Sequence, residues 1–421
     1  MSARTPSGQA PSRRGWAQAL VVASAGLIAM VAVAALGLWA AGAADLPDGA
    51  FARVVAATVV TSVGGVVQFS GEAGGLAGTT AELTVIPLSV TLAGALVTAA
   101  GFLRPLRHRA PAGPGELGAW AGRVAVLWLL GLLGLALAAR QTFRISLGDS
   151  AVRDIADLFG VTPEVGFTTD VPSSLLLGLL WLAGVLALAL LVSRAAPLPG
   201  RLERLREPAR PAASAMVALL LAYVGLGLVV GLVVAGRGQP ADTFAVLLLG
   251  LPNLAWLGLT LGLGATWDGR VEGPFALPVP PALDQVLRSS EVQALNVGTL
   301  AGHDGRWWWL VAVAVVLVAA AAFGAAVRAP AGTRLWRHAA HMAVALALTV
   351  LMICLTCRVS ASYGLSVLGI GDLGGDLAGE LFLRPRLWSA LGLAVLWGAA
   401  AGLLGGLPAR AVRRRGAGPR T

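Results

Sequence analysis

Uninterrupted apolar stretches, each about as long as a membrane is thick, constrain this chain more than any other feature. A helix needs about 20 apolar residues to cross the hydrocarbon core of a bilayer. Only 12% of the residues are charged and 57% are hydrophobic, whereas about 25% are charged in a soluble domain. We therefore predict an all-α, polytopic helical membrane protein. The apolar segments lie at 18–41, 51–69, 83–103, 117–139, 173–193, 213–236, 243–265, 307–327, 339–357 and 387–407, and the one at 51–69 is the weakest.

These ten segments divide into two sets of five with a shared layout of apolar and polar stretches. We predict a cytoplasmic basic N-terminus (1–17), membrane repeat 1 (18–211), membrane repeat 2 (212–409) and a cytoplasmic basic tail (410–421). Duplicated bundles are common among transporters and channels. The alternative is a chance similarity, because an Ala- and Leu-rich chain produces similar hydropathy without duplication.

The placement of arginine distinguishes two ways of threading the repeats. If segments 51–69 and 243–265 turn back, the halves run parallel, and 20 of the 31 basic residues but only 3 of the 21 carboxylates lie on the cytoplasmic side. If all ten segments span, the arginines divide almost evenly between the two sides. Short cytoplasmic loops are enriched in arginine and lysine. We therefore favour the parallel threading, with both termini in the cytoplasm of a multi-pass membrane protein.

A proline followed by an asparagine lies halfway along segment 243–265. Pro252 removes a backbone donor and clashes with the preceding turn, so a helix tends to break there. Gly64 and Gly65, which also weaken a helix, occupy the position that we match to it in the first half. We predict a helix–break–helix segment that enters and leaves on the outer side. The alternative is a spanning helix with a proline kink.

The candidate contacts for a permeating solute are Pro252, Asn253, Gly64, Gly65, Arg140 and Arg358. The Asn253 amide and the carbonyl groups freed by the break could coordinate an ion or a polar solute. The alternative is that Asn253 caps a helix or bonds to a neighbouring helix. Arg140 and Arg358 stand at matching helix exits and could bind an anion, although such arginines more often extend to the membrane interface.

Other polar residues do not form a recognisable site. Six outer carboxylates match no known metal-binding loop: Asp149, Asp154, Asp157, Asp372, Asp376 and Glu380. Cys354 and Cys357 have redox-motif spacing but lie in an apolar helix, and His338 and His341 lack a third metal ligand. We predict no catalytic residue, metal or cofactor, and we expect that the protein is not an enzyme. Its positive charge suits anionic lipid at cytoplasmic loops rather than nucleic acid.

Several motifs in order resemble the streptophobe family, which comprises very hydrophobic, multi-spanning proteins of streptomycetes and their relatives. The motifs are VIPLSVTLAGALV (85–97), GFLRPLR (101–107), ARQTF (139–143), LGLPNLAWL (249–257), DGRVEGPF (268–275) and GIGDLGG (369–375). The resemblance implies an actinobacterial plasma-membrane protein and carries over no functional residue.

Two functions remain open from the sequence. The favoured one is a transport- or channel-like duplicated bundle whose two returning segments meet near a pseudo-two-fold axis. The alternative is a non-transporting membrane scaffold, sensor or partner subunit of an envelope system.

Overall fold

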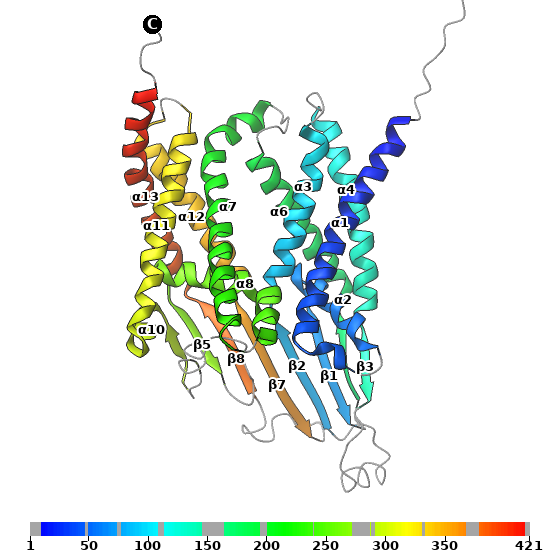
Figure 1. Ribbon diagram of the computed structural model, residues 1–421. Coiled ribbons are helices and arrows are strands. Elements are labelled where there is room, and N and C mark those ends of the chain that lie inside the picture. Colours follow the sequence, from blue (N-terminus) through cyan, green and yellow to red (C-terminus); the bar gives the residue numbers. More distant parts are fainter. Residues whose placement is uncertain are drawn as a thin grey trace, which may run out of the picture.

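The computed structural model combines a bundle of long helices with one β-sheet at a single end of the bundle (Figure 1). It describes residues 10–46, 49–73, 77–107, 113–144, 164–193, 200–238, 240–271, 287, 291–330, 333–367 and 379–416.

Within the described residues, nine helices are long and apolar enough to cross a membrane. They are α1 (Ala10–Ala40), α3 (Leu88–Arg107), α4 (Pro114–Ala138), α6 (Val171–Val192), α7 (Gly200–Ala235), α8 (Pro240–Gly262), α11 (Trp309–Arg328), α12 (Leu335–Thr356) and α13 (Leu387–Gly416). The prediction of a polytopic helical membrane protein is confirmed. The weak segment at 51–69 is a 13-residue helix, α2 (Ala50–Ser62), followed by a strand.

The helices are apolar on all sides, and packing decides which side faces the protein. In α4, Val124, Trp128 and Leu132 recur at four-residue spacing, and each is fully buried. Val126 and Leu130, on the opposite side, are about half exposed. Because residues four apart share one helix face, α4 has one protein-facing side and one side that is suited to lipid tails.

Small residues bring α12 and α13 into close contact. A Cβ added at Gly398 would lie 2.6 Å from Ala343 Cα, and one added at Gly402 would lie 2.7 Å from Ala339 Cα. Small residues at helix interfaces allow this backbone approach and the van der Waals contact that membrane helices depend on.

The eight-stranded antiparallel sheet was not predicted from the sequence. Its strands are β1 (Val67–Ala73), β2 (Ala77–Thr84), β3 (Gln141–Arg144), β4 (Glu164–Thr169), β5 (Trp267–Val271), β6 (Gln293–Leu295), β7 (Val359–Val367) and β8 (Gly379–Pro385). They are arranged in the order β3-β4-β1-β2-β7-β8-β5-β6.

All the strands come from connections at one end of the bundle. Four connections each supply two strands, namely α2–α3, α4–α6, α8–α11 and α12–α13. The start of α1, the end of α13 and the neighbouring ends of α3 and α4, of α6 and α7, and of α11 and α12 lie at the other end of the bundle (Figure 1). Short elements complete the sheet end, namely η1 (Ala43–Asp45), α10 (Val297–His303) and η2 (Gly305–Trp308). Consequently α1 and α7 run in the same direction, from the far end toward the sheet.

The two halves of the chain contribute their strands in the same order. In the first half the order is third, fourth, first, second, and it is the same in the second half. The halves meet where β2 pairs with β7, over eight residue pairs from Ala77↔Val367 to Thr84↔Ser360. A two-fold axis would reverse the order of the second set of strands. The predicted pseudo-two-fold arrangement is therefore wrong, and the halves stand head to tail.

Helices α2 and α8, which belong to different halves of the chain, end in the same way. Gly64 has φ 94° and Gly264 has φ 90°, a left-handed conformation that glycine adopts without steric cost. The amide of the following residue bonds back to the helix in each case, Gly65 to Val60 at 3.0 Å and Ala265 to Thr260 at 2.9 Å. Each chain segment then enters the first strand of its half.

Candidate functional site

The predicted break at Pro252 is wrong, because α8 continues through this residue to Gly262. Matching the chain reversals at Gly64 and Gly264 aligns Pro252 with the first turn of α2, which begins at Ala50. Proline is tolerated in the first turn of a helix, where its missing N–H costs little. Pro252 therefore marks the start of the part of α8 that corresponds to α2, and it does not correspond to Gly64 and Gly65.

A hydroxyl group from the other half of the chain enters α8 just before the proline. Ser89 Oγ donates to the Leu247 carbonyl at 2.9 Å and accepts from the Leu251 amide at 3.2 Å. These two backbone groups pair with each other in a regular helix. A side chain inserted at such a point is one of the known causes of helix bending.

Asn253 fastens the same helix to the start of α3. Its Oδ1 accepts from the Leu88 amide at 3.1 Å, and its Nδ2 donates to the Ile86 carbonyl at 2.9 Å. The Leu88 amide, one of those that the start of a helix leaves without a partner in the helix, is therefore hydrogen-bonded by the other half of the chain. The alternative weighed for Asn253, a bond to a neighbouring helix, describes these contacts.

The end of α2 also contacts the first turn of α3. Thr91 Oγ1, one turn into α3, donates to the Ser62 carbonyl at 2.6 Å. A Cβ added at Gly65 would lie 2.5 Å from Val60 Cγ1 and 2.8 Å from Ser174 Oγ, so Gly65 is required by close packing. The start of α3 therefore contacts the end of α2 and the middle of α8. We call the hydrogen bonds of Ile86, Leu88 and Ser89 with α8 the inter-half joint.

Arg140 and Arg358 have matching positions but are not brought together. Each side chain is exposed, and each residue directly precedes a strand, β3 or β7. These strands are four positions apart in the sheet, or roughly 19 Å at the usual strand spacing. They do not form a shared anion site.

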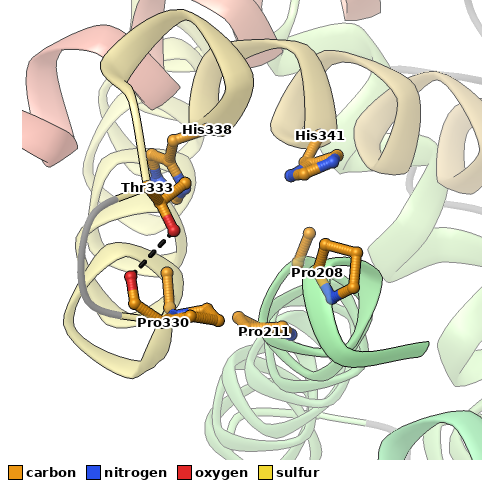
Figure 2. Close-up of a pocket in the computed structure, with 8 residues that line it drawn as sticks. Pro208, Pro211, Pro330, Thr333, His338 and His341 are labelled. Carbon is orange, nitrogen blue, oxygen red and sulfur yellow. Dashed lines mark hydrogen bonds between the residues drawn. The ribbon is translucent and has the colours of Figure 1, made fainter. Parts of the chain in front are cut away.

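The two histidines of α12 line a small cavity, together with residues of α7 and of the chain between α11 and α12 (Figure 2). Its volume is about 20 Å³, enough for about one water molecule. His338 Nε2 lies 3.2 Å from the Ala322 carbonyl, which can only accept, so this nitrogen carries the proton. Among the described residues, no three His, Cys, Asp or Glu side chains gather as a metal site would require.

The remaining candidates divide between buried residues and residues beyond the described part. Cys354 and Cys357 are free thiols buried in the core of the second half. Asp149, Asp154, Asp157, Asp372 and Asp376 lie outside the described residues, and of Glu380 only the backbone, in β8, is described.

Sequence reasoning missed two kinds of contact. The first is a bidentate ion pair on the sheet, in which Arg386 Nε lies 3.0 Å from both Asp268 carboxylate oxygens and Nη2 lies 2.7 Å from Oδ1. The carboxylate raises the pKa of the Arg386 guanidinium above its usual range. The second is a pair of indole hydrogen bonds between elements: the buried Trp256 donates to the Leu220 carbonyl at 3.2 Å, and the partly buried Trp397 donates to the Leu263 carbonyl at 3.0 Å. The neighbouring residues in the sequence do not indicate partners that lie so far along the chain.

Comparison of the chain with protein families, with curated proteins and with solved structures returns no match in any of the three. The arrangement of its own residues is therefore the basis for assigning a function.

Proposed function

We propose that the protein is a non-transporting scaffold of the plasma membrane, whose β-sheet stands on the outer face as a platform for an envelope protein. In this proposal eight helices cross the bilayer, and α2 and α8 return to the side from which they came. The two halves, 18–211 and 212–409, are tandem structural repeats.

The sidedness of this proposal rests on charge. The described arginines at the end of the bundle opposite the sheet include Arg14, Arg104, Arg328, Arg334 and Arg337. Arginine-rich ends stay in the cytoplasm, so the sheet faces outward and both termini face inward. The same arginines are placed to contact anionic lipid headgroups.

The observation that carries the scaffold function is the continuous sheet across both halves. Alternating-access transport requires one half to rock against the other. Here the halves share the β2–β7 ladder of eight residue pairs. They also share the inter-half joint. There Asn253 accepts from the Leu88 amide, and Ser89 donates to the Leu247 carbonyl, each bond crossing between the halves. Because the halves are joined both in the sheet and at the inter-half joint, the bundle suits a fixed platform better than two halves that move against each other.

Two measurements test this function together. A photoreactive amino acid at Gln68 or Arg384, exposed positions on the sheet, is expected to cross-link one defined envelope protein in living cells. The same residue at Leu180, which is 68% exposed on α6, is the lipid-facing control and is expected to give no such product. Purified protein in planar bilayers is expected to leave ion conductance at the level of lipid alone. Conductance that Asn253→Leu abolishes would instead establish the channel hypothesis.

The resemblance of the quoted motifs supports a second proposal, that the chain is a streptophobe family protein of an actinobacterial plasma membrane. Expression in such a host with a fluorescent tag, followed by membrane fractionation, tests the location.

A further inference from the structure

We propose that the chain binds the phosphate group of an anionic phospholipid at the start of α13, through Arg358, Arg384 and Arg386. We call these three residues the arginine cluster. The proposal goes beyond the scaffold function, since it needs no envelope partner. It also holds for either orientation of the sheet, because both leaflets of a bilayer contain phospholipid.

The arginine cluster lies at the ends of two membrane spans that pack against each other. Arg358 follows the span of α12, which ends at Thr356, and Arg384 and Arg386 precede the span of α13, which begins at Leu387. All three arginine side chains are exposed. Arginines next to the end of a span extend to the level of the lipid headgroups.

Strand register gathers these arginines around one carboxylate. Arg384 lies directly opposite Asp268 in the β5–β8 ladder. Arg358, one step beyond the last pair of the β7–β8 ladder, lies opposite Arg384 on its other side. Side chains directly opposite each other share a sheet face, with their Cβ atoms about 5 Å apart. Arg386 is bound to both oxygens of Asp268 and so belongs to the same group.

The one carboxylate does not balance this positive charge. Asp268 is occupied by Arg386, and the Arg384 guanidinium lies over the Phe382 ring, 5.0 Å from its centroid. Within the described residues, Arg358 and Arg384 have no carboxylate partner. Like charges directly opposite each other destabilise a sheet. An anion bound between these two arginines would remove their repulsion.

The first half of the chain shows what the same position carries without such a charge. The amide of Asp170, before α6, donates to the Val66 carbonyl at 3.4 Å. The amide of Arg386, before α13, donates to the Thr266 carbonyl at 3.0 Å. Each acceptor lies two residues after the left-handed glycine of its half. Asp170 is therefore the counterpart of Arg386.

The neighbouring positions differ between the halves as well. Gln68 pairs with Thr168 as Asp268 pairs with Arg384. With Arg140 matching Arg358, the first half has one arginine and one aspartate, which cancel. The second half has three arginines and one aspartate, a net charge of +2.

This difference falls at the start of a helix, where it affects the helix directly. The first amides of a helix have no partner within it, and the helix dipole favours a negative charge there. Asp170 supplies that charge to α6, whereas α13 has Arg386 in the same place. Phosphate groups bind at helix starts for these reasons, and arginine binds them through two parallel hydrogen bonds. A bound phosphate would thus do for α13 what Asp170 does for α6.

Apolar side chains beside the arginine cluster favour a lipid over a free anion. Leu355, in the last turn of α12, is 44% exposed. In the first turn of α13, Leu387 is 38% exposed and Trp388 is 88% exposed. Tryptophan is enriched at the membrane interface. These residues offer acyl chains a surface directly next to the three guanidinium groups.

Fluorescence quenching at matched positions of the two halves tests the proposal. A bimane label is attached at Ser389→Cys or at Ser173→Cys, each three residues after Arg386 or Asp170, in protein that also carries Cys354→Ser and Cys357→Ser. Each protein is placed in phosphatidylcholine nanodiscs with increasing phosphatidylglycerol that carries a doxyl quencher on its acyl chain. The label at 389 is expected to be quenched at a several-fold lower fraction of this lipid than the label at 173. Doxyl-labelled phosphatidylcholine is expected to quench both labels equally.

Adding Arg358→Gln and Arg384→Gln is expected to remove the difference between the two labels, whereas Arg140→Gln is expected to leave it unchanged. Excess potassium phosphate, compared with potassium chloride at equal ionic strength, is expected not to restore the fluorescence.

Three results would overturn the proposal. Equal quenching at 389 and 173 would mean that the arginine cluster does not select anionic lipid, and this comparison does not depend on folding of the arginine variants. A difference that survives Arg358→Gln and Arg384→Gln would place the lipid elsewhere. Fluorescence restored by potassium phosphate would mean that the site takes a free anion. The envelope-protein cross-link from Gln68 reports separately on the scaffold function.

Discussion

At the residue scale, Asn253 and Ser89 show how polar side chains within an apolar bundle serve cohesion. Their four hydrogen bonds all cross from one half of the chain to the other. The sequence showed that Asn253 is unusual, because an amide within an apolar segment stands out. Its partners could not be predicted, because Ile86 and Leu88 belong to the other half of the chain and offer only backbone groups.

We predict that Asn253→Leu lowers the free energy of unfolding by about 2 kcal/mol, since it leaves the Leu88 amide and the Ile86 carbonyl without their partner. Thermal unfolding in detergent, followed by the fluorescence of the buried indoles, measures the loss. Thr349→Val is the matched control, because the Thr349 hydroxyl bonds only within its own helix, to Ala345. Equal midpoints for the two variants would mean that the joint contributes no stability.

Ser89→Ala is expected to cost about 1 kcal/mol in the same assay, since the hydroxyl makes two bonds to α8. The control is Ser214→Ala, which removes a bond to Pro211 inside α7 alone. If the inserted hydroxyl bends α8, Ser89→Ala also changes the distance between spin labels at Thr243 and Gly258, whereas Ser214→Ala leaves it unchanged. An unchanged distance in both would remove the bend from this account.

At the element scale, the reversal after α2 and α8 determines how each half enters the sheet. Gly64→Ala and Gly264→Ala are each expected to destabilise by about 1 kcal/mol, the cost of a left-handed conformation for a residue with a Cβ. Neither added Cβ meets an atom closer than 3.6 Å, so backbone strain is the only cause. Gly184→Ala, mid-helix with open space around it, is expected to be neutral or stabilising. If Gly64→Ala raised the stability instead, the left-handed conformation of Gly64 would be contradicted.

The long helices could be predicted from the sequence because span length and apolar content are local properties. The sheet could not, because its pairs depend on distant residues. Segment 51–69 combines α2 with the start of β1, and segment 83–103 combines the end of β2 with most of α3. An apolar window records composition and does not separate a helix from a strand that follows it. The central ladder joins β2, near the start of the chain, to β7, which lies in the second half.

At the scale of the whole molecule, the head-to-tail order of the strands explains why both halves face the same way. The distribution of arginine in the sequence already favoured parallel halves. The strand order agrees with parallel halves, and the sheet is continuous across both. The predicted meeting of two returning segments about a two-fold axis required a reversed order. The two segments predicted to return, α2 and α8, lie in different halves, and α8 contacts α1 and α3 of the first half where the two halves meet.

The parallel orientation of the two halves, with the sheet on the outer side, is tested by sided labelling of single cysteines. The variants are Arg107→Cys and Arg334→Cys, each with Cys354→Ser and Cys357→Ser, in intact cells and in inverted vesicles. We expect a membrane-impermeant maleimide to reach both sites only in inverted vesicles. Labelling of position 107 in intact cells, with position 334 still protected, would mean that all ten segments span and that the halves are inverted. That result would contradict the account.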